Sequence, residues 1–425
     1  MITLRPATRF LLALLALSPA AALAQERAIE LDDSRDSDEQ QVASNEGAVF
    51  GRVRFLTGTI TLRRETRILE DPEMNDPVVP GDVVQSGPLS RTEVQLADGT
   101  LVRVDEDSEL VLLSLPDGST GLGDSTILQV LSGSILIRAE SMGSAEKRFQ
   151  VDTDSASIFI LSDGLFRIDV RDDGTTIVSS RRVASEIVAE EESAMIRSGE
   201  RVTVRPGRPP GEAHPFNTRL RDEFDLWSSE RDDALLHRER VDTRIPSGLP
   251  DPIEPYADEL SYYGRWFNYP SYGWVWRPVG LASDWQPYLS GRWAWAPGGL
   301  VWVSHEPWGW APFHYGRWEF LVGNGWVWIP GHIFSGGWVA WSYSPGYFGW
   351  CPLGYYDYPV RFSLSIGFPR FPWIYVRSRH LYERRVVRVV EPRYMAELVQ
   401  DGRSPPVHGR ELSRLGPGEE PVRVE

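Results

Sequence analysis

The feature that most constrains this chain is a run of tryptophans in its C-terminal half. Of the 17 tryptophans, 15 lie within residues 266–350. The tripeptide Gly-Arg-Trp recurs there at residues 264–266, 291–293 and 316–318. A repeat of this length indicates one supersecondary unit per copy, and each unit buries its apolar face only against its neighbours.

Each copy continues with a second piece rich in tryptophan and valine, at residues 273–278, 300–303 and 325–330. Where two tryptophans are spaced by two, as Trp274 and Trp276 are, a strand places both indoles on the same face. We therefore predict that each copy is a β-hairpin or a three-stranded unit with a tryptophan-lined face. A fourth, degenerate copy occupies residues 337–341 and 350–353.

Two interpretations of these tryptophans compete. In the structural one, the rings fill the core, because thin repeats lack core volume and each tryptophan buries on the order of 200 Å². The repeat arginines would then stack on neighbouring indoles. In the functional one, an exposed row of indoles binds peptidoglycan or another envelope glycan by stacking on the C–H faces of the sugars. The candidate ligand-binding residues are Trp266, Trp293, Trp318, Arg265, Arg292 and Arg317.

The N-terminus has the pattern of a secretory signal peptide, predicted at residues 1–24. Arg5 and Arg9 supply the positive region, residues 10–17 the short apolar region, and residues 22–24 the small-x-small cleavage site. No later segment approaches membrane-spanning length. We expect a periplasmic or secreted protein with no integral membrane segment apart from the signal peptide.

Charge and cysteine content exclude some classes of function. The formal net charge is −16, which disfavours nucleic-acid binding because phosphate contacts depend on Lys and Arg. Cys351 is the only cysteine, so no intrachain disulfide or cysteine-based zinc site is available. It stands in a Trp-x-Pro motif where other copies have Gln286 and Ala311, which favours a small buried residue over a reactive thiol.

Short alternating strands cut by glycine turns dominate residues 47–205, after an acidic lead at 25–46 that is expected to be disordered. The strongest hairpin signal is Asp98-Gly99, between strands expected at residues 93–96 and 101–104. Separate strands are also expected at 126–130 and 134–138, on either side of Gly133. Many short strands with such turns predict an all-β sandwich, barrel or solenoid.

Part of this region resembles the FecR domain. The resemblance rests on residues 81–87, 94–100, 102–104 and 107–110, and continues at 129–134, 149–153 and 198–202. It implies an extracytoplasmic, noncatalytic β-domain, β-solenoid-like in form, that contacts other proteins. The best-known members relay signals from an outer-membrane receptor, through a membrane helix and a cytoplasmic anti-sigma segment that we do not find in this sequence. The tryptophan region with its tail resembles a Trp-rich domain of unknown function that follows FecR-like domains in exported bacterial proteins.

Residues 206–258 are predicted to be a linker containing one amphipathic helix at about 218–236. Leu220, Phe224 and Trp227 would form the face that docks on a β-domain, with Asn217 or Thr218 as the cap. The Trp-rich β-repeat domain is then expected at residues 259–376, with closing strands at 362–366 and 373–376. An Arg-rich, mostly disordered tail follows at 377–425, either solvated or in contact with anionic lipid or polymer.

Signals for enzymatic chemistry are weak. Ser144 and Lys147 match a Ser-x-x-Lys motif, but they lie in an expected inter-strand loop rather than on a helix. His305, His314 and His332 lack the spacing of a metal motif. We predict no catalytic residues, no metal and no cofactor.

The sequence thus predicts a mainly β protein with a FecR-like solenoid or sandwich domain and a Trp-rich domain of short hairpins. Its predicted function is noncatalytic binding or scaffolding in the bacterial cell envelope, with an envelope protein or a cell-wall glycan as partner. Two alternatives are a glycan- or peptidoglycan-binding module acting through the Trp-rich repeats, and a FecR-type transmembrane signal-relay component. Exposed repeat tryptophans would favour the glycan module.

Overall fold

The computed structural model describes residues 51–64, 67–115, 125–139, 148–181, 185–236, 245–344, 346–360, 372–388, 390 and 407–408. The predicted signal peptide, the acidic lead, the Ser144–Lys147 motif, the strand expected at 362–366 and most of the predicted tail lie outside these residues. About half of the described residues lie in strands and far fewer in helices, so the mainly β fold class is confirmed.

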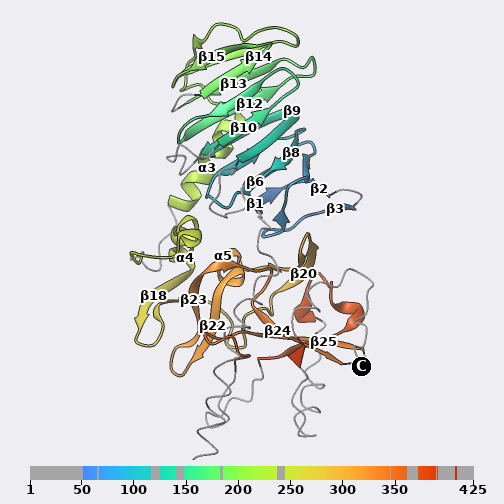
Figure 1. Cartoon of the computed structure of the whole chain (residues 1–425), viewed down its shortest axis with the longest axis vertical. Coiled ribbons are helices and arrows are strands. Elements are labelled where there is room, and N and C mark those ends of the chain that lie inside the picture. Colours follow the sequence, from blue (N-terminus) through green and yellow to red (C-terminus); the bar gives the residue numbers. More distant parts are fainter. Residues whose placement is uncertain are drawn as a thin grey trace, which may run out of the picture. The chain divides into compact units, whose positions relative to one another are not determined.

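The N-terminal β-domain consists of two sheets packed face to face around one apolar core (Figure 1). Sheet A runs in the order β4-β1-β6-β7-β9-β12-β13-β16-β17, and sheet B in the order β3-β2-β5-β8-β9-β10-β11-β14-β15. Sheet A contains β1 (Gly51–Thr57), β4 (Pro77–Val78), β6 (Arg91–Gln95), β7 (Leu101–Val104), β9 (Ser125–Ala139), β12 (Gly164–Val170), β13 (Thr176–Ser180), β16 (Glu200–Val204) and β17 (His214–Pro215). Sheet B shares β9 and adds β2 (Ile60–Arg64), β3 (Arg67–Glu70), β5 (Val83–Ser86), β8 (Glu109–Ser114), β10 (Arg148–Asp152), β11 (Ser157–Ile160), β14 (Ser185–Ala189) and β15 (Glu192–Ile196).

Strand β9 connects the two sheets and replaces the two separate strands predicted from the sequence. Its first half pairs with β8 and β10 in sheet B, and its second half pairs with β7 and β12 in sheet A. The change of sheet occurs at Gly133, whose φ is +80°. A Cβ atom there would lie 2.1 Å from Ser108 Oγ, so only glycine fits this bend. The predicted hairpin at Asp98-Gly99 is confirmed by the pairing of β6 with β7.

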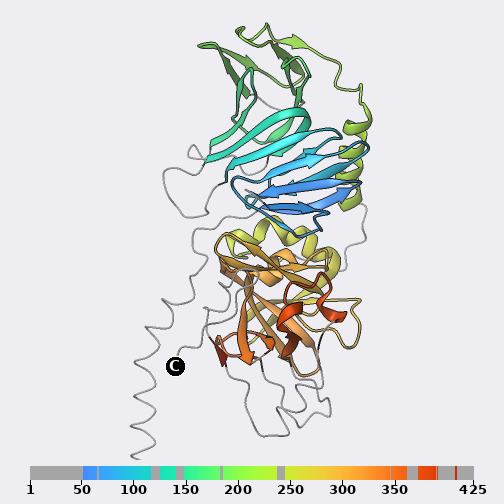
Figure 2. The ribbon, with the colours of Figure 1, turned by 90° about the vertical axis from the view of Figure 1, so that its right-hand side faces the viewer.

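Sheet A is covered on its outer face by helix α3 (Glu223–Leu236), which runs along the side of the stacked strands in Figure 2. Strands β6, β7 and β13 are therefore buried almost throughout, whereas β11 and β14 alternate between core and surface. The helix begins later than predicted, because the Asp225 N–H donates to Asp222 Oδ1 over 2.9 Å and Asp222 caps the first turn. Leu220 precedes the helix and is 72% exposed, so the prediction that it lies on the docking face is wrong.

The Trp-rich domain begins with a 3₁₀ helix η1 (Asp251–Tyr256) and helix α4 (Ala257–Tyr263). Four hairpins follow, which confirms that each repeat copy is a β-hairpin (Figure 1). They are β18 (Gly264–Tyr269) with β19 (Gly273–Pro278), β20 (Gly291–Ala296) with β21 (Gly299–Ser304), β22 (Tyr315–Leu321) with β23 (Gly325–Phe334), and β24 (Val339–Ser344) with β25 (Tyr347–Pro352). Helix α5 (Trp310–His314) precedes the third hairpin. Strands β18, β19, β23 and β22 form one four-stranded sheet in that order, here called sheet C.

The described part of the predicted tail packs against this domain. Strand β26 (Ile374–Arg377) pairs with β25, which confirms the closing strand expected near residue 374. Two 3₁₀ helices follow, η3 (Ser378–His380) and η4 (Val386–Arg388), and β27 (Val407–His408) pairs with β24. Leu381 and Val386 are buried in the tryptophan core, and Tyr382 and Val390 pack against it, so this stretch is not the fully solvated segment that one of the two predicted alternatives described.

Candidate functional site

The four hairpins share one cross-strand arrangement of tryptophans. In each, a tryptophan of the first strand lies directly opposite a tryptophan of the second strand. The pairs are Trp266–Trp276, Trp293–Trp302, Trp318–Trp328 and Trp341–Trp350. All eight rings belong to a single buried cluster. The register also identifies Trp341, rather than Trp338, as the member of the fourth copy that corresponds to the Gly-Arg-Trp tryptophan.

The proposed indole platform is therefore wrong. Trp266, Trp293 and Trp318 are each only 1% exposed, and they contact other tryptophans instead of solvent. The physical reason is the two-residue period of a strand, which points the tryptophan of Gly-Arg-Trp into the core and the preceding arginine to the opposite face. Each copy alone is too thin to enclose an indole, so the rings of successive copies enclose one another.

The glycine of the repeat is required by the same packing. A Cβ atom on Gly291 would lie 2.6 Å from the ring of Trp302 and 2.4 Å from the carbonyl oxygen of Val303. A Cβ atom on Gly264 would meet the ring of Trp276 at 2.4 Å. The partner tryptophan thus lies across the start of the first strand, where any side chain would displace it.

The three repeat arginines have three different environments. Arg265 is exposed on the outer face of sheet C, the face opposite the tryptophan core. Arg317 lies 3.4 Å from the ring centroid of Trp338 and forms an ion pair with Asp357, which confirms the predicted stacking on an indole for this copy. Arg292 is buried and contacts the N-terminal β-domain, so the structure does not bring these arginines together into one ligand site.

Arg292 belongs to a buried polar junction between the β-domain and the Trp-rich domain. It pairs with Asp76 and, at 3.3 Å, with Glu73. The Asn75 amide donates to the carbonyl oxygens of Ser304 at 3.0 Å and Glu306 at 2.9 Å. The desolvated charges of this junction are stabilised only while both domains remain in contact.

Arg52 of β1 extends the same junction. It donates to Gln95 Oε1 and Asn75 Oδ1, both over 2.9 Å, and forms an ion pair with Glu259 of α4. Val79 of the β-domain is a member of the tryptophan core cluster. The junction is therefore partly apolar as well as charged, and every one of its β-domain members precedes the Trp-rich domain by more than 150 residues.

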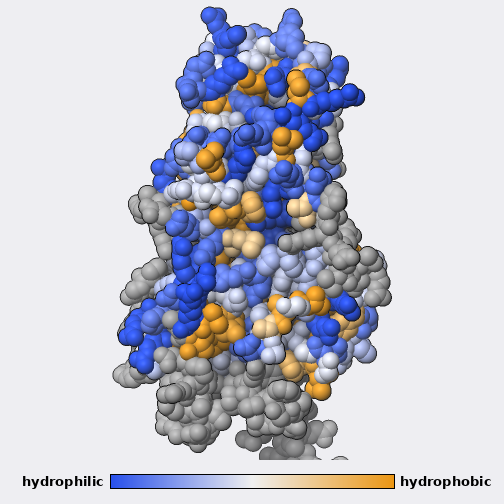
Figure 3. Space-filling model, turned by 180° about the vertical axis from the view of Figure 1, so that it is seen from behind, coloured by the Kyte–Doolittle hydropathy of each residue, from blue (hydrophilic) through white to orange (hydrophobic). Residues whose placement is uncertain are grey.

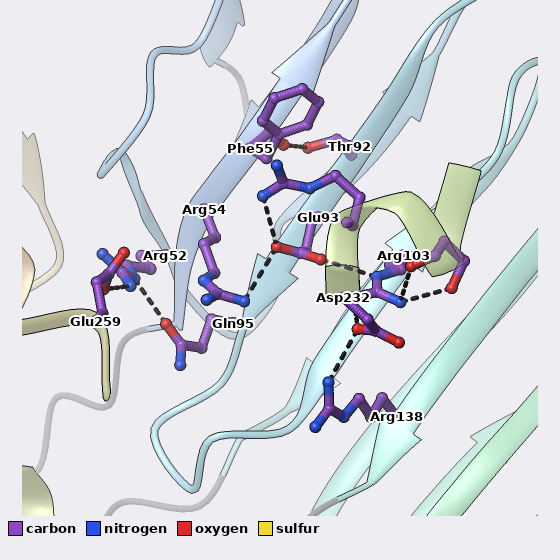
Figure 4. Close-up of polar contacts among 12 residues, drawn as sticks. Arg52, Arg54, Phe55, Thr92, Glu93, Gln95, Arg103, Arg138, Asp232 and Glu259 are labelled. Atoms are coloured by element: carbon purple, nitrogen blue, oxygen red, sulfur yellow. Dashed lines mark hydrogen bonds and ion pairs between the residues drawn. The ribbon is translucent and has the colours of Figure 1, made fainter. Parts of the chain in front are cut away.

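A second buried network attaches helix α3 to sheet A. Figure 4 shows Glu93 of β6 between Arg54 and Arg103, with Asp232 of the helix between Arg103 and Arg138. Burial alone would raise the pKa of Glu93, but the nearby arginines outweigh it and hold the pKa at about 2. The carboxylate is thus ionised and fully enclosed. Glu93 anchors the helix because its Oε1 also accepts a hydrogen bond from Arg231 of α3 over 3.2 Å.

Other buried titratable groups are also engaged in structural contacts. Burial lowers the pKa of His314 to about 4, and its Nδ1–H donates to the Ser335 carbonyl oxygen over 2.9 Å. Burial raises the pKa of Glu306, whose oxygens accept from Trp285 Nε1 at 2.6 Å and from Ser304. Burial likewise raises the pKa of the Cys351 thiol, which is fully enclosed as the sequence predicted. Within the described ranges, no group of three or more His, Cys, Asp or Glu residues could hold a metal ion.

An open hollow beside α3 is lined by several arginines but is largely neutralised by neighbouring carboxylates. Arg167 pairs with Asp169 at 2.8 Å and with Asp222 at 2.6 Å, and Arg181 pairs with Asp225 at 2.5 Å. These contacts connect sheet A to the start of the helix. The arrangement is that of a docking interface rather than an anion site.

Among the residues that the structure describes, the most exposed aromatic side chains are tyrosines near one end of sheet C. Tyr269 and Tyr272 stack with ring centroids 5.4 Å apart, and Tyr272 lies 4.9 Å from Tyr355. Tyr356 contacts Tyr355 at 5.1 Å and is 69% exposed, and Tyr358 is 72% exposed. We call this set the tyrosine surface: Tyr269, Tyr272, Tyr355, Tyr356 and Tyr358.

The tyrosine surface borders an open hollow of about 430 Å³ that contains one carboxylate. The hollow is lined by Glu319, Gly354, Tyr356, Tyr358, Pro359 and Val360. Glu319 Oε1 accepts a hydrogen bond from the Tyr355 N–H over 3.0 Å. A Cβ atom on Gly354 would lie 2.4 Å from this oxygen, so the carboxylate packs closely against the loop and leaves no room for a side chain there. The arrangement suits binding of a ligand that offers both flat apolar faces and hydroxyl groups.

The fold and these sites define a mainly β protein with two unlike domains and a surface of exposed tyrosines on the second. Residues 82–181 match the FecR protein family, and residues 257–357 match DUF6600, a family of unknown function. The chain thus carries a FecR domain followed by a Trp-rich domain of the DUF6600 type, as the sequence resemblance predicted. No curated protein matches the chain.

Similar solved structures include two crystal structures, at 1.65 and 2.50 Å resolution, of a candidate anti-sigma factor from Parabacteroides distasonis ATCC 8503. Each is 20% identical to this chain, with a TM-score of 0.26 and coverage of 32% of this chain. The match spans 59% of the length of that protein.

Two groups of residues were missed by sequence reasoning. The tyrosine surface had a sequence signal, which is the presence of three tyrosines among residues 355–358. The junction residues Arg52, Asn75 and Asp76 had no local signal, because their partners lie in a different domain. Asn75 has a φ of +69°, a conformation that sequence alone does not reveal.

Proposed function

We propose that this protein is a noncatalytic binding and scaffold protein of the bacterial cell envelope, acting in the periplasm or outside the cell. The observation that carries the proposal is the junction, where Arg52, Asn75 and Arg292 connect the FecR domain to the Trp-rich domain through buried contacts. Such contacts hold the two domains together, so that their two different surfaces can be presented at the same time, as a scaffold requires. The partner is an envelope protein or a cell-wall glycan.

The proposal that the protein is noncatalytic is supported by how its buried titratable groups are used. His314, Glu306 and Cys351 each face packed side chains or backbone carbonyls in the tryptophan core. A catalytic acid, base or nucleophile needs access to a substrate pocket. The match to FecR proteins, a family of regulatory character, favours the same interpretation.

The proposed location rests on the predicted signal peptide at residues 1–24. Within the described residues, no helix has the length and apolar character needed to cross a membrane. The test is fractionation of cells that produce the full chain with a C-terminal tag. We expect the protein in the osmotic-shock fluid or the envelope pellet, with Gln25 as its first residue. Recovery in the cytoplasm with an intact N-terminus would overturn the proposal.

A second candidate function, signal relay through a protein partner, is favoured by the FecR match itself. It predicts that deletion of the chain alters transcription from a promoter under an extracytoplasmic sigma factor. It also predicts that the N-terminal segment remains uncleaved. Unchanged transcription together with a cleaved N-terminus would exclude relay and leave the scaffold proposal standing.

A further inference from the structure

The exposed tyrosines of the tyrosine surface lie apart from the buried tryptophans that form the core, and the packing of the fold does not account for them. All eight paired tryptophans are buried, whereas Tyr355, Tyr356 and Tyr358 are exposed although large aromatic side chains stabilise a fold best when enclosed. On the face seen in Figure 3, hydrophobic residues form separate patches among hydrophilic ones. An ordered group of exposed rings therefore calls for a ligand.

We propose that the tyrosine surface, with the hollow beside Glu319, is a polysaccharide-binding site for β-linked chains of N-acetylated hexose units such as those of the cell wall. This inference deepens the proposed envelope function and rests on it. The rings present apolar faces for the C–H faces of the sugars, and a phenol hydroxyl can both donate and accept a hydrogen bond at the sugar edge.

The site is held in place before any ligand binds. The loop of residues 353–359 is closed by a hydrogen bond from the Gly354 N–H to the Tyr358 carbonyl oxygen over 2.8 Å. It is tied to sheet C by the Arg317–Asp357 ion pair and by Glu319. A surface whose geometry is already set loses less conformational entropy on binding, which is how a small contact gains affinity.

The polar groups favour a sugar over other ligands. Glu319 Oε1 is engaged by the Tyr355 N–H, and Oε2 accepts no hydrogen bond from the residues that the structure describes. A carboxylate oxygen in an aromatic-lined hollow is a strong acceptor for ligand hydroxyl or amide N–H groups, and it repels phosphates. Proline-rich peptides also dock in aromatic-lined grooves, so poly-L-proline is included below as the competing probe.

The same face of sheet C carries additional groups for a longer ligand. The rings of Tyr269 and Tyr272 pack on an apolar cluster that includes Val275 and Val327, and because both valines are fully buried this cluster supports the rings without reaching a ligand. Arg265, at the other end of β18, alternates onto this face and is exposed. The surface therefore extends beyond a single sugar unit, as expected for a site that binds along a polymer rather than at its end.

The experiment is sedimentation of the purified full chain with four probes: peptidoglycan sacculi, chitin, cellulose and immobilised poly-L-proline. We expect binding to sacculi and to chitin, which share the acetylated sugar, and weaker binding to cellulose. The double variant Tyr356→Ala/Tyr358→Ala should lose about tenfold or more in affinity, since exposed aromatic residues dominate such contacts. Glu319→Gln should also weaken binding, while its unchanged shape keeps the Tyr355 hydrogen bond.

The matched control is Trp274→Ala. Trp274 is an exposed aromatic residue of the first hairpin, on the face opposite Tyr269, and its replacement should change the affinity less than about twofold. Unchanged unfolding midpoints establish that the tyrosine variants are folded. Binding to sacculi but not chitin, binding only to poly-L-proline, or full retention of binding in the double variant would each overturn the inference. A protein that localises to the envelope but fails these tests leaves the scaffold proposal intact.

Discussion

Arg292 of the second repeat forms a buried ion pair with Asp76, which lies 216 residues earlier in the chain. In the other copies the equivalent arginines face solvent or stack on an indole, so one position of the repeat has been adapted to hold two domains together. Burial raises the pKa of Asp76 even though Arg292 opposes that effect. The pair is thus stable only because both partners are present.

Replacing Arg292 should weaken the fold at the junction. Arg292→Met leaves the Asp76 carboxylate buried without its cation, and we expect a loss of about 3–5 kcal/mol in the free energy of unfolding. Adding Asp76→Asn to this variant should recover part of the loss. Guanidinium denaturation followed by tryptophan fluorescence measures both, with Arg265→Met as the control at an exposed equivalent position. Equal stability of the Arg292 and Arg265 variants would contradict the role assigned to the junction.

The repeat glycines should tolerate no side chain. Gly291→Ala places a Cβ atom against Trp302 and the Val303 carbonyl oxygen, so we expect about 1–3 kcal/mol of destabilisation or more. Gly87→Ala is the control, because its Cβ would have no neighbour closer than 3.6 Å and its backbone needs no positive φ. Thermal unfolding by circular dichroism compares the two. The packing account fails if both substitutions shift the midpoint equally.

The repeat could be predicted from the sequence because its signals are local. A two-residue period and a glycine turn define a hairpin, and Trp293 with Trp302 shows that such a pattern also sets the cross-strand register. What the pattern does not specify is which face of the hairpin becomes the core. The tryptophan face becomes the core because the four copies pack against one another. The sequence of a single copy therefore does not show which face is buried.

The functional surface could not be predicted for a related reason. Tyr272 and Tyr355 lie 4.9 Å apart in space but belong to the first hairpin and to the loop after the fourth. They meet because Glu319 and Arg317 of β22 hold the loop after the fourth hairpin against sheet C, to which the first hairpin belongs. The bend of β9 at Gly133 is similar, since the sequence signals a break there but not that hydrogen bonding continues with new partner strands.

Cys351 should be unreactive in the folded protein. Its thiol is enclosed next to Val360, and burial raises its pKa, so the nucleophilic thiolate is scarce at neutral pH. We expect no labelling by iodoacetamide over hours under native conditions and complete labelling in guanidinium. Mass spectrometry of the intact chain measures the extent. Rapid native labelling would show that the 351–360 segment opens, and would contradict the burial described here.

Acid should weaken the attachment of helix α3 through Glu93. The pKa of this carboxyl is held at about 2 in the folded protein by Arg54, Arg103 and Arg231, against an ordinary value of 4.5. Because the folded pKa lies below the unfolded one, the stabilisation is fully present above pH 4.5 and is lost as the pH falls toward 2.

The variant Glu93→Gln tests this, since it keeps the shape and removes the titration. At pH 7 it should be less stable than the wild type by about 3–5 kcal/mol, because Arg103 is then left buried with one partner fewer. Between pH 4.5 and 2.5 its stability should fall less steeply than that of the wild type. The control is Glu109→Gln, at a more exposed ion pair with Arg63, which should follow the wild-type curve. Parallel curves for wild type and Glu93→Gln would mean that the acid sensitivity of the fold originates elsewhere.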